Sequence, residues 1–489
     1  MSLRKNYLFE LMYQIIMVLF PLMTVPYVSR VLGANGVGVF AYSGSIVQYF
    51  ILMGTLGIGV YGSKTIATVR DDKQKLSKTF ISIFSLQITM SLLAIVAYVL
   101  FVLFGVNESK LIMYLQTLAL LSCLVDCTWF FTGLEKFKSI VLRNTVVRVI
   151  SIILLFILVK NPDDLALYTL IMTGSTLLGQ IVLWVGIKDY ITYVPIALSD
   201  ILSHLKPTLV YFIPLIAIQI YFVLNKTMLG VFSTKAEVGL FDYADKLLKV
   251  CLTFVTSLGT IMLPKIAYIF SSGKIAEVKG YIHKSLDFST MIAVPIMFGL
   301  AGISSEFIPW YLGKEFEQTI DILLIISPTI LFMAWSGVFG TQYLLPLGRM
   351  KIYNISVYIG AVINLVLNLF LIKNYGAIGA AISTLAAEFF VLTVQFIAIK
   401  KEFTFKPIFM KSSDYFIAGI VMYIVVRAIG VYGGVGVGTT LMQISIGAIT
   451  YVAMVMMIEY YKNDGLLLNE LRKRYFALMK KRVYKKSTL

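Results

Sequence analysis

Long apolar stretches recur along this 489-residue chain, and they constrain its fold more than any other feature. A helix that crosses the hydrocarbon core of a bilayer needs about 20 consecutive apolar residues, and about 14 stretches of that length are present. We therefore predict one all-α polytopic membrane protein with about 14 transmembrane helices. The predicted segments are 8–29, 37–61, 80–104, 111–131, 140–159, 165–188, 207–231, 238–262, 286–308, 318–343, 352–372, 376–399, 414–432 and 438–461.

The net charge is +17, and the positions of the basic side chains agree with the predicted topology. If the N-terminus is cytoplasmic, most Lys and Arg side chains fall in inside segments, as the positive-inside rule requires. We therefore expect both termini in the cytoplasm, a basic C-terminal tail that contacts anionic lipid headgroups, and no nucleic-acid partner. The three cysteines lie in apolar helices and predict neither a disulfide framework nor a metal site.

An internal repeat defines the predicted domains. VGVFAY (37–42) resembles VGLFDY (238–243), and in both cases a helix ends at Leu-Gly before the next begins at Val-Gly. Further similarities pair GLEK (133–136) with GRMK (348–351). Parallel repeats predict two six-helix lobes, 1–188 and 207–400, with a substrate site between them. Residues 189–206 would form a cytoplasmic linker, and 401–489 two additional helices with the basic tail.

Basic residues within apolar segments predict an anionic passenger, because a charge at bilayer depth usually faces protein or a water-filled cavity. Asp242, Asp245, Lys246 and Lys249 follow the spacing i, i+3, i+4 and i+7, which places them on one helical face. Two pairs, Asp242–Lys246 and Asp245–Lys249, can form at i, i+4. This face could bind phosphate oxygens, with Asp242 and Asp245 as the counter-charges when no passenger is bound. Alternatively, the pairs only stabilise helix packing, or the segment begins in the outer interface.

Four other basic residues lie within or at the end of predicted apolar segments. Lys226 is either a cavity ligand or a lysine that extends to the outer surface. Arg148 is either a cavity residue or, like the nearby Arg143, an anchor at the cytoplasmic interface. Arg30, at the outer end of the first helix, could guide a lipid headgroup. For Arg427 we favour an interfacial anchor.

Two acids and three prolines suggest how transport could be coupled and gated. Asp126 and Glu388 lie in apolar segments, where either could bind H⁺ or Na⁺ or serve as a polar packing contact. Pro21, Pro26 and Pro214 remove backbone donors in the first helix of each half, which fits hinges for alternating access.

Four motifs together resemble the Wzx-type oligosaccharide flippases, of the superfamily that includes lipid II flippases and MATE exporters. They are SRVLGANGVGVF (29–40), TWFFTGLEKFK (128–138), NKTMLGVFSTKAEVGLFDYADKLLK (225–249) and QYLLPLGRMK (342–351). The resemblance runs along most of the chain. Asn225 departs from it, because many relatives have an acid before the lysine.

The resemblance implies a flippase, not an enzyme, in a bacterial cytoplasmic membrane. Its passenger would be undecaprenyl-diphosphate-linked oligosaccharide for capsule, exopolysaccharide or O-antigen-like assembly, moved by membrane potential or an ion gradient. Membrane lipids, Na⁺ or H⁺, and polysaccharide polymerase and chain-length machinery are candidate partners. We expect no cofactor.

Three alternative functions stay open. A lipid II flippase shares the predicted architecture. A MATE-like drug exporter would need acids where this chain has lysines. A membrane polymerase would need larger outer loops, and a scaffold of glycan assembly is separable only by an activity assay.

Overall fold

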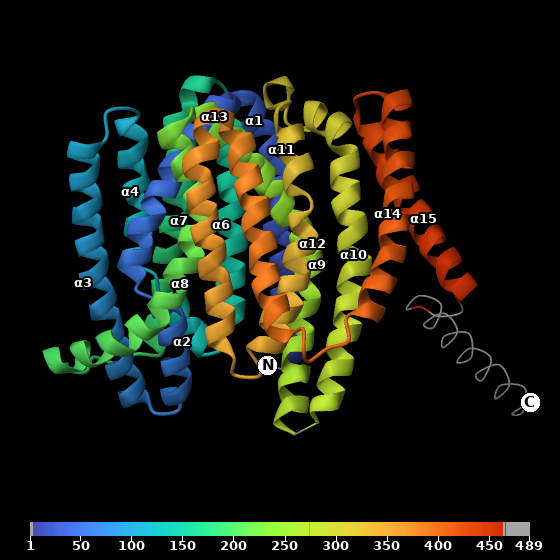
Figure 1. Ribbon diagram of the computed structural model, residues 1–489. Helices are drawn as coiled ribbons and strands as arrows, with labels where there is room; N and C mark the ends of the chain where they lie inside the picture. The colour runs from blue at the N-terminus through green and yellow to red at the C-terminus, as the bar shows by residue number, and fades with distance from the viewer. Residues whose placement is uncertain (1–2, 273, 463–464, 466–489) are drawn as a thin grey trace, which may run out of the picture. The chain divides into compact units, whose positions relative to one another are not determined.

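The computed structural model describes residues 3–272, 274–462 and 465, which form helices and short connections without a strand (Figure 1). Nine stretches of these residues are long and apolar enough to cross a membrane. The protein is therefore an all-α, multi-pass membrane protein. Each predicted apolar segment lies on helical structure, whereas the total of about 14 crossings stays a prediction.

Two compact units divide the chain, and the first contains the residues up to Tyr243 together with Leu365–Ala380. Within it α1 contacts α3, α4, α6 and α8, while α4 and α6 pack against α7. Its elements are α1 (Leu3–Thr55), α2 (Ile58–Val69), α3 (Lys73–Gly105), α4 (Lys110–Leu124), α5 (Thr128–Gly133), α6 (Phe137–Leu158), η1 (Pro162–Asp164), α7 (Leu165–Leu183), η2 (Trp184–Asp189) and α8 (Leu198–Phe232).

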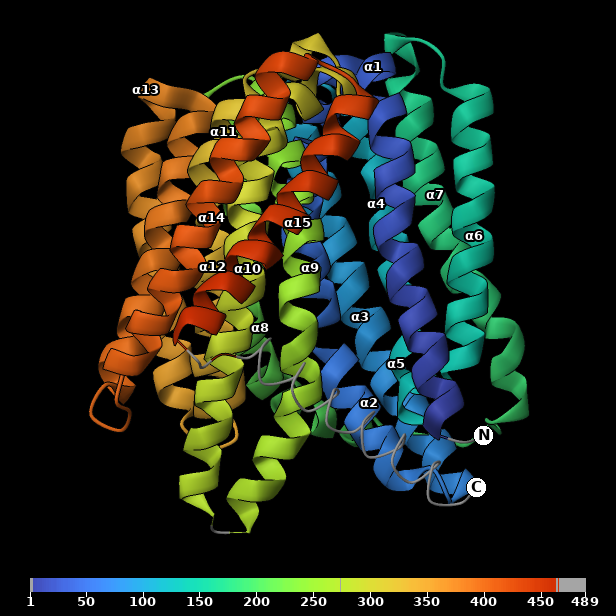
Figure 2. The same cartoon turned by 90° about the vertical axis from the view of Figure 1, so that its right-hand side faces the viewer.

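The second unit comprises Ala244–Asn364 and the chain from Ala381 onward. Here α10 packs against α12, α14 and α15, and α14 runs beside α15 (Figure 2). The elements are α10 (Ile275–Tyr311), η3 (Lys314–Phe316), α11 (Thr319–Ile326), α12 (Thr329–Gly337), the π-helix η4 (Val338–Leu344), α14 (Lys406–Gly433) and α15 (Val437–Lys462).

Two helices contribute residues to both units: α9 (Lys235–Ser271) and α13 (Met350–Ile399). The unit boundaries therefore differ from the predicted lobes 1–188 and 207–400, which stay a prediction. Two helices are also broken by a glycine in a conformation that side chains disfavour. Gly33 in α1 has φ 65° and Gly376 in α13 has φ 53°. Both breaks fall where the sequence predicts the end of one apolar segment and the start of the next.

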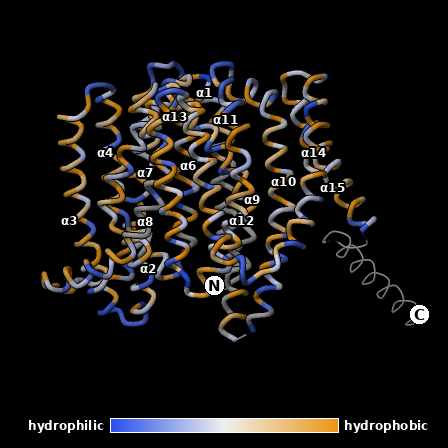
Figure 3. Tube along the Cα trace, viewed as in Figure 1, coloured by the Kyte–Doolittle hydropathy of each residue, from blue (hydrophilic) through white to orange (hydrophobic). Residues whose placement is uncertain are grey.

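Hydrophobic residues cover most of the length of the helices (Figure 3). Aromatic packing joins α3 to α5 in the first unit, where Phe80 lies 5.4 Å from the Trp129 ring and 4.7 Å from the Phe130 ring. The Trp129 indole N–H donates to Gln87 Oε1 at 2.9 Å, so this buried polar group is satisfied.

The predicted linker 189–206 is partly helical, because α8 begins at Leu198. Lys78 Nζ lies 2.9 Å from Asp200 Oδ1, and His204 Nδ1 lies 2.6 Å from the Tyr61 hydroxyl. Partial burial lowers the pKa of His204 below its ordinary value, although the Asp200 carboxylate acts in the opposite direction. The linker is thus fastened to α2 and α3 of its own unit.

The three predicted hinge prolines lie within continuous helices. Pro21 and Pro26 are in α1, whose only non-helical residue is Gly33, and Pro214 is in α8. Pro26 is half-buried, whereas the side chains of Pro21 and Pro214 lie outside the described part of the structure. Their hinge role stays a prediction.

Candidate functional site

The central feature of the candidate site is an ion pair between α8 and α9, which form a helical hairpin. Lys226 Nζ lies 2.5 Å from Asp242 Oδ1, with the lysine side chain 19% exposed and the aspartate 3% exposed. The i, i+4 spacing offered Lys246 as a possible partner of Asp242, and it gave no partner for Lys226. A charge this well buried needs an opposite charge nearby, and the neighbouring helix supplies it.

Residues 225–227 join α8 to three different helices of the first unit. Asn225 Oδ1 accepts from Asn368 Nδ2 of α13 at 2.7 Å, and Lys226 reaches α9. Thr227 Oγ1 lies 3.0 Å from Ser45 Oγ of α1. Successive helical residues point about 100° apart, so three adjacent side chains contact three neighbours. The Asn-Lys-Thr motif therefore fixes the position of α8 within its unit.

The second charged pair on α9 forms as predicted. Lys249 Nζ donates to Asp245 Oδ2 at 2.7 Å, and these residues belong to the second unit. The Lys249 side chain is 44% exposed and that of Asp245 18%, while Lys246 is half-buried. One ion pair on α9 is therefore buried and the other is open to its surroundings.

The α8–α9 turn is fixed by Lys235 and Glu237. Lys235 Nζ donates to the Gly230 carbonyl at 2.6 Å and lies 3.8 Å from the centre of the Tyr42 ring. Burial lowers the pKa of Lys235. Glu237 Oε2 accepts from the Ala377 N–H at 2.6 Å, directly after the break in α13 at Gly376. A carboxylate at a helix N-terminus is favourable, because backbone donors there have no intrahelical partner.

The other predicted basic residues have separate environments. Arg30 is exposed on α1 and Arg148 is half-buried on α6. Arg143 is buried, and its Nη1 donates to the Gly179 carbonyl and to Gln180 Oε1, each at 2.8 Å. The Arg143 guanidinium therefore joins α6 to α7, while its position at the cytoplasmic interface stays a prediction.

The two candidate coupling acids also differ. Asp126 Oδ1 accepts from the Thr128 N–H at 2.8 Å and so stabilises the start of α5. Glu388 is buried on α13, with 5% of its surface exposed. The Asp126 contact agrees with the packing interpretation, while ion coupling by either acid stays a prediction. Among the described residues, no cluster of three His, Cys, Asp or Glu could hold a metal ion.

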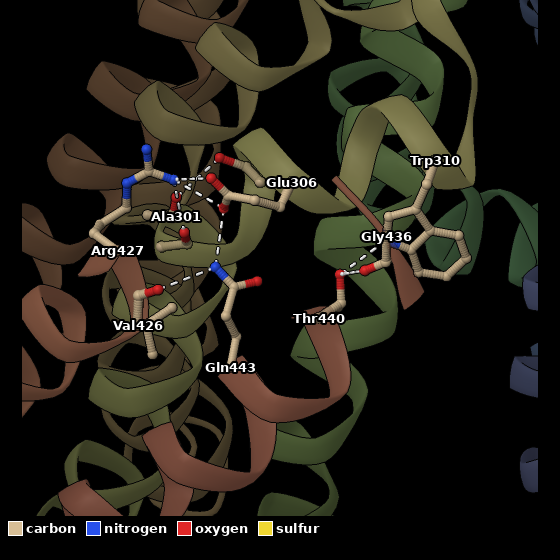
Figure 4. A network of polar contacts seen from close by, with 10 residues as sticks. Ala301, Glu306, Trp310, Val426, Arg427, Gly436, Thr440 and Gln443 are labelled. Carbon is tan, nitrogen blue, oxygen red and sulfur yellow. Dashed lines mark hydrogen bonds and ion pairs between the residues drawn. The ribbon is translucent and has the colours of Figure 1, made fainter. Parts of the chain in front are cut away.

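Arg427 belongs to a polar network inside the second unit (Figure 4), while its role as an interfacial anchor stays a prediction. Its Nη1 lies 2.9 Å from Glu306 Oε2, and the Gln443 amide donates to the same oxygen at 2.9 Å. Glu306 is 6% exposed. The network joins α10, α14 and α15, and local sequence spacing contains no signal for it.

Solved structures of helical membrane transporters share this fold. A solved structure of "Lipid II flippase MurJ, inward closed conformation" matches with a TM-score of 0.76 and 17% identity, over 93% of this chain and all of that one. An inward-facing MATE family multidrug transporter of the MOP superfamily matches with a TM-score of 0.58 and 15% identity, over 78% of this chain and 94% of the other. At these identities the likeness defines the fold.

The family follows from sequence. The family described as "Polysaccharide biosynthesis protein" matches residues 3–270, and the chain belongs to it. The "Putative O-antigen transporter" of Escherichia coli (strain K12) is 26% identical over 82% of this chain and 98% of its own length. The "Capsular polysaccharide biosynthesis protein CapF" of Staphylococcus aureus is 24% identical over 68% of this chain and 85% of its own length.

Proposed function

We propose that this protein is a flippase for lipid-linked oligosaccharides. Its passenger would be undecaprenyl-diphosphate-linked repeat units, moved from the inner to the outer leaflet of a bacterial cytoplasmic membrane for surface polysaccharide assembly. Membership of the polysaccharide biosynthesis family and similarity to an O-antigen transporter support the substrate class. The observation that carries the proposal is the exposed basic group on α9, where Lys249 is 44% exposed.

The energies of the two ion pairs decide which lysines could bind phosphate. An exposed pair such as Asp245–Lys249 contributes about 0–1 kcal/mol, so a diphosphate can replace the carboxylate at little cost. Separating a buried pair such as Lys226–Asp242 costs about 3–5 kcal/mol. We therefore assign phosphate binding to Lys246 and Lys249. Lys226, with Asp242, would hold the helical hairpin that presents them.

Membrane potential would drive the passenger outward. A diphosphate carries about two negative charges, and moving them out of a negative interior is favoured by about 4.6 kcal/mol per 100 mV. When the passenger leaves, Asp245 is the counter-charge that Lys249 regains. The empty protein, with its basic groups, would be drawn in the opposite direction.

The test is flux of a diphosphate-linked oligosaccharide lipid in proteoliposomes. Lys246→Ala/Lys249→Ala should reduce flux at least about tenfold, because each charge-assisted contact contributes about 1.5–3 kcal/mol. The control Lys400→Ala/Lys401→Ala removes the same charge from the exposed connection after α13 and should keep normal flux. Undiminished flux in the α9 variant would refute the assigned phosphate site.

Two further experiments test the electrical driving force and the flippase activity separately. An imposed potential should accelerate flux in one direction, and indifference to it would contradict the electrical drive while leaving the flippase intact. No flux from the unaltered chain with any diphosphate-linked lipid, lipid II included, would refute the flippase itself.

A further inference from the structure

A cavity of about 590 Å³ lies in the second unit, at the ends of three helices and apart from the candidate site on α9. It is formed by the first half of α10, the start of α14 and the end of α15. Its charged lining consists of Lys284, Lys406, Lys411, Lys462, Asp287 and Asp414, with His283 beside them. Four lysines against two aspartates leave the cavity net positive.

Two of the four lysines are held by the aspartates. Lys411 Nζ lies 2.5 Å from Asp287 Oδ2, and the Tyr415 hydroxyl donates to the other oxygen of Asp287 at 2.8 Å. Lys462 Nζ lies 2.6 Å from Asp414 Oδ1. These pairs join the three helices and set the shape of the cavity.

The excess positive charge comes from the other two lysines. Lys284 and Lys406 are both exposed, and neither forms an ion pair within the described part of the chain. Lys284 Nζ lies 5.8 Å from the centre of the Tyr281 ring, a cation–π contact. This contact does not neutralise the ammonium, which can still bind an anion. A cavity with two such lysines attracts a group that carries one or two negative charges.

Apolar surface continues directly from this charged end. Met410 lines the cavity and is 59% exposed, and Phe409 and Ile417 on the same helix are 47% and 51% exposed. All three helices that form the cavity are long and apolar enough to cross a membrane. A ligand that fits both surfaces has an anionic head and hydrocarbon chains.

We propose that this cavity binds the phosphate headgroup of an anionic membrane phospholipid. Basic pockets between transmembrane helices are suited to such headgroups, since the lysines meet the phosphate while the acyl chains lie along the helices. This site would be separate from the passenger site on α9, so it goes beyond the proposed function. The bound lipid would fasten α14 and α15 to α10.

The test measures lipid binding by native mass spectrometry and by the shift in melting temperature of the purified full-length protein. Phosphatidylglycerol should bind and raise the melting temperature, whereas phosphatidylcholine and inorganic phosphate should not. Lys284→Gln/Lys406→Gln should weaken phosphatidylglycerol binding by about 30-fold. This variant leaves both ion pairs in place. The matched control Lys400→Gln/Lys401→Gln should bind normally.

Three results would overturn the proposal. Equal phosphatidylglycerol binding by Lys284→Gln/Lys406→Gln and Lys400→Gln/Lys401→Gln would exclude the cavity as the lipid-binding site. Equal protection by inorganic phosphate would identify a free anion as the ligand. If Lys284→Gln/Lys406→Gln does not fold, a photoreactive phosphatidylglycerol on the unaltered protein still decides the question. Its label must map to residues 283–287 or 406–414, and labelling elsewhere refutes the site.

Discussion

Gly38 and Gly239 occupy equivalent positions in the two sequence repeats, and their helices touch there. A Cβ at Gly38 would lie 1.5 Å from the Lys235 carbonyl oxygen, and a Cβ at Gly239 would lie 2.2 Å from that of Ala34. Ala34 and Lys235 are themselves equivalent in the repeat alignment, so the contact is symmetric. The repeated Val-Gly pair thus marks a close approach of two backbones within the first unit.

Alanine at either glycine should therefore push α1 and α9 apart. We expect Gly38→Ala and Gly239→Ala each to destabilise the protein by about 1–3 kcal/mol, as overpacked contacts do. Thermal unfolding of the detergent-solubilised protein measures the change. Gly174→Ala in α7 is the control, since no atom lies within 4 Å of its added Cβ. Melting of all three variants at the same temperature would contradict the close contact.

The buried ion pair gives a second prediction. Lys226→Met removes the cation 2.5 Å from the buried Asp242 carboxylate and should destabilise the protein by about 3–5 kcal/mol. Lys226→Met/Asp242→Leu removes both charges and should recover much of this loss. Lys249→Met, on the exposed pair, should change stability by about 0–1 kcal/mol. The melting temperatures of Lys226→Met, Asp242→Leu and the double variant form a double-mutant cycle that checks the pair. Additive effects of Lys226→Met and Asp242→Leu would exclude a direct interaction.

Sequence patterns predicted contacts within one helix better than contacts between helices. Asp245–Lys249 follows from i, i+4 spacing, and the breaks at Gly33 and Gly376 follow from the lengths of the apolar segments. The partner of Arg427 could not be predicted in this way. Glu306 lies on a helix far away in the sequence, and the pairing depends on how α10 and α14 pack.

Contacts between helices near the candidate site were also not predicted from the sequence. Lys226 was recognised as a charge in an apolar segment, but its pairing with Asp242 needs the geometry of the α8–α9 hairpin. The repeat pointed to Gly38 and Gly239 as equivalent residues without predicting that they meet. The Asn225–Asn368 hydrogen bond has a weak local signal at most, an amide within an apolar segment.

The network around Glu306 predicts how α14 and α15 are held. Glu306→Leu removes the acceptor of both Arg427 and Gln443, so we expect faster hydrogen exchange along α14 and α15 and a loss of about 3–5 kcal/mol in stability. Hydrogen exchange followed by mass spectrometry localises the effect. The control Glu317→Leu changes an exposed acid on the connection before α11 and should leave exchange unaltered. Unchanged protection in Glu306→Leu would show that apolar packing alone holds these helices.

His204 predicts a pH dependence for the start of α8. Its folded-state pKa is below the ordinary value of 6.5, so the unfolded chain binds a proton more readily. The stability that the neutral ring contributes is therefore present above about pH 6.5 and is lost as the pH falls through the folded-state pKa. The protection factors of residues 198–206, which correct exchange for its slower intrinsic rate in acid, should fall on acidification from pH 7.5 to 5. His204→Gln should abolish that fall, whereas His283→Gln, at the only other histidine of the chain, should retain it. A fall that persists in His204→Gln would assign the acid sensitivity to other groups, with Asp200 and its contact to Lys78 as the nearest.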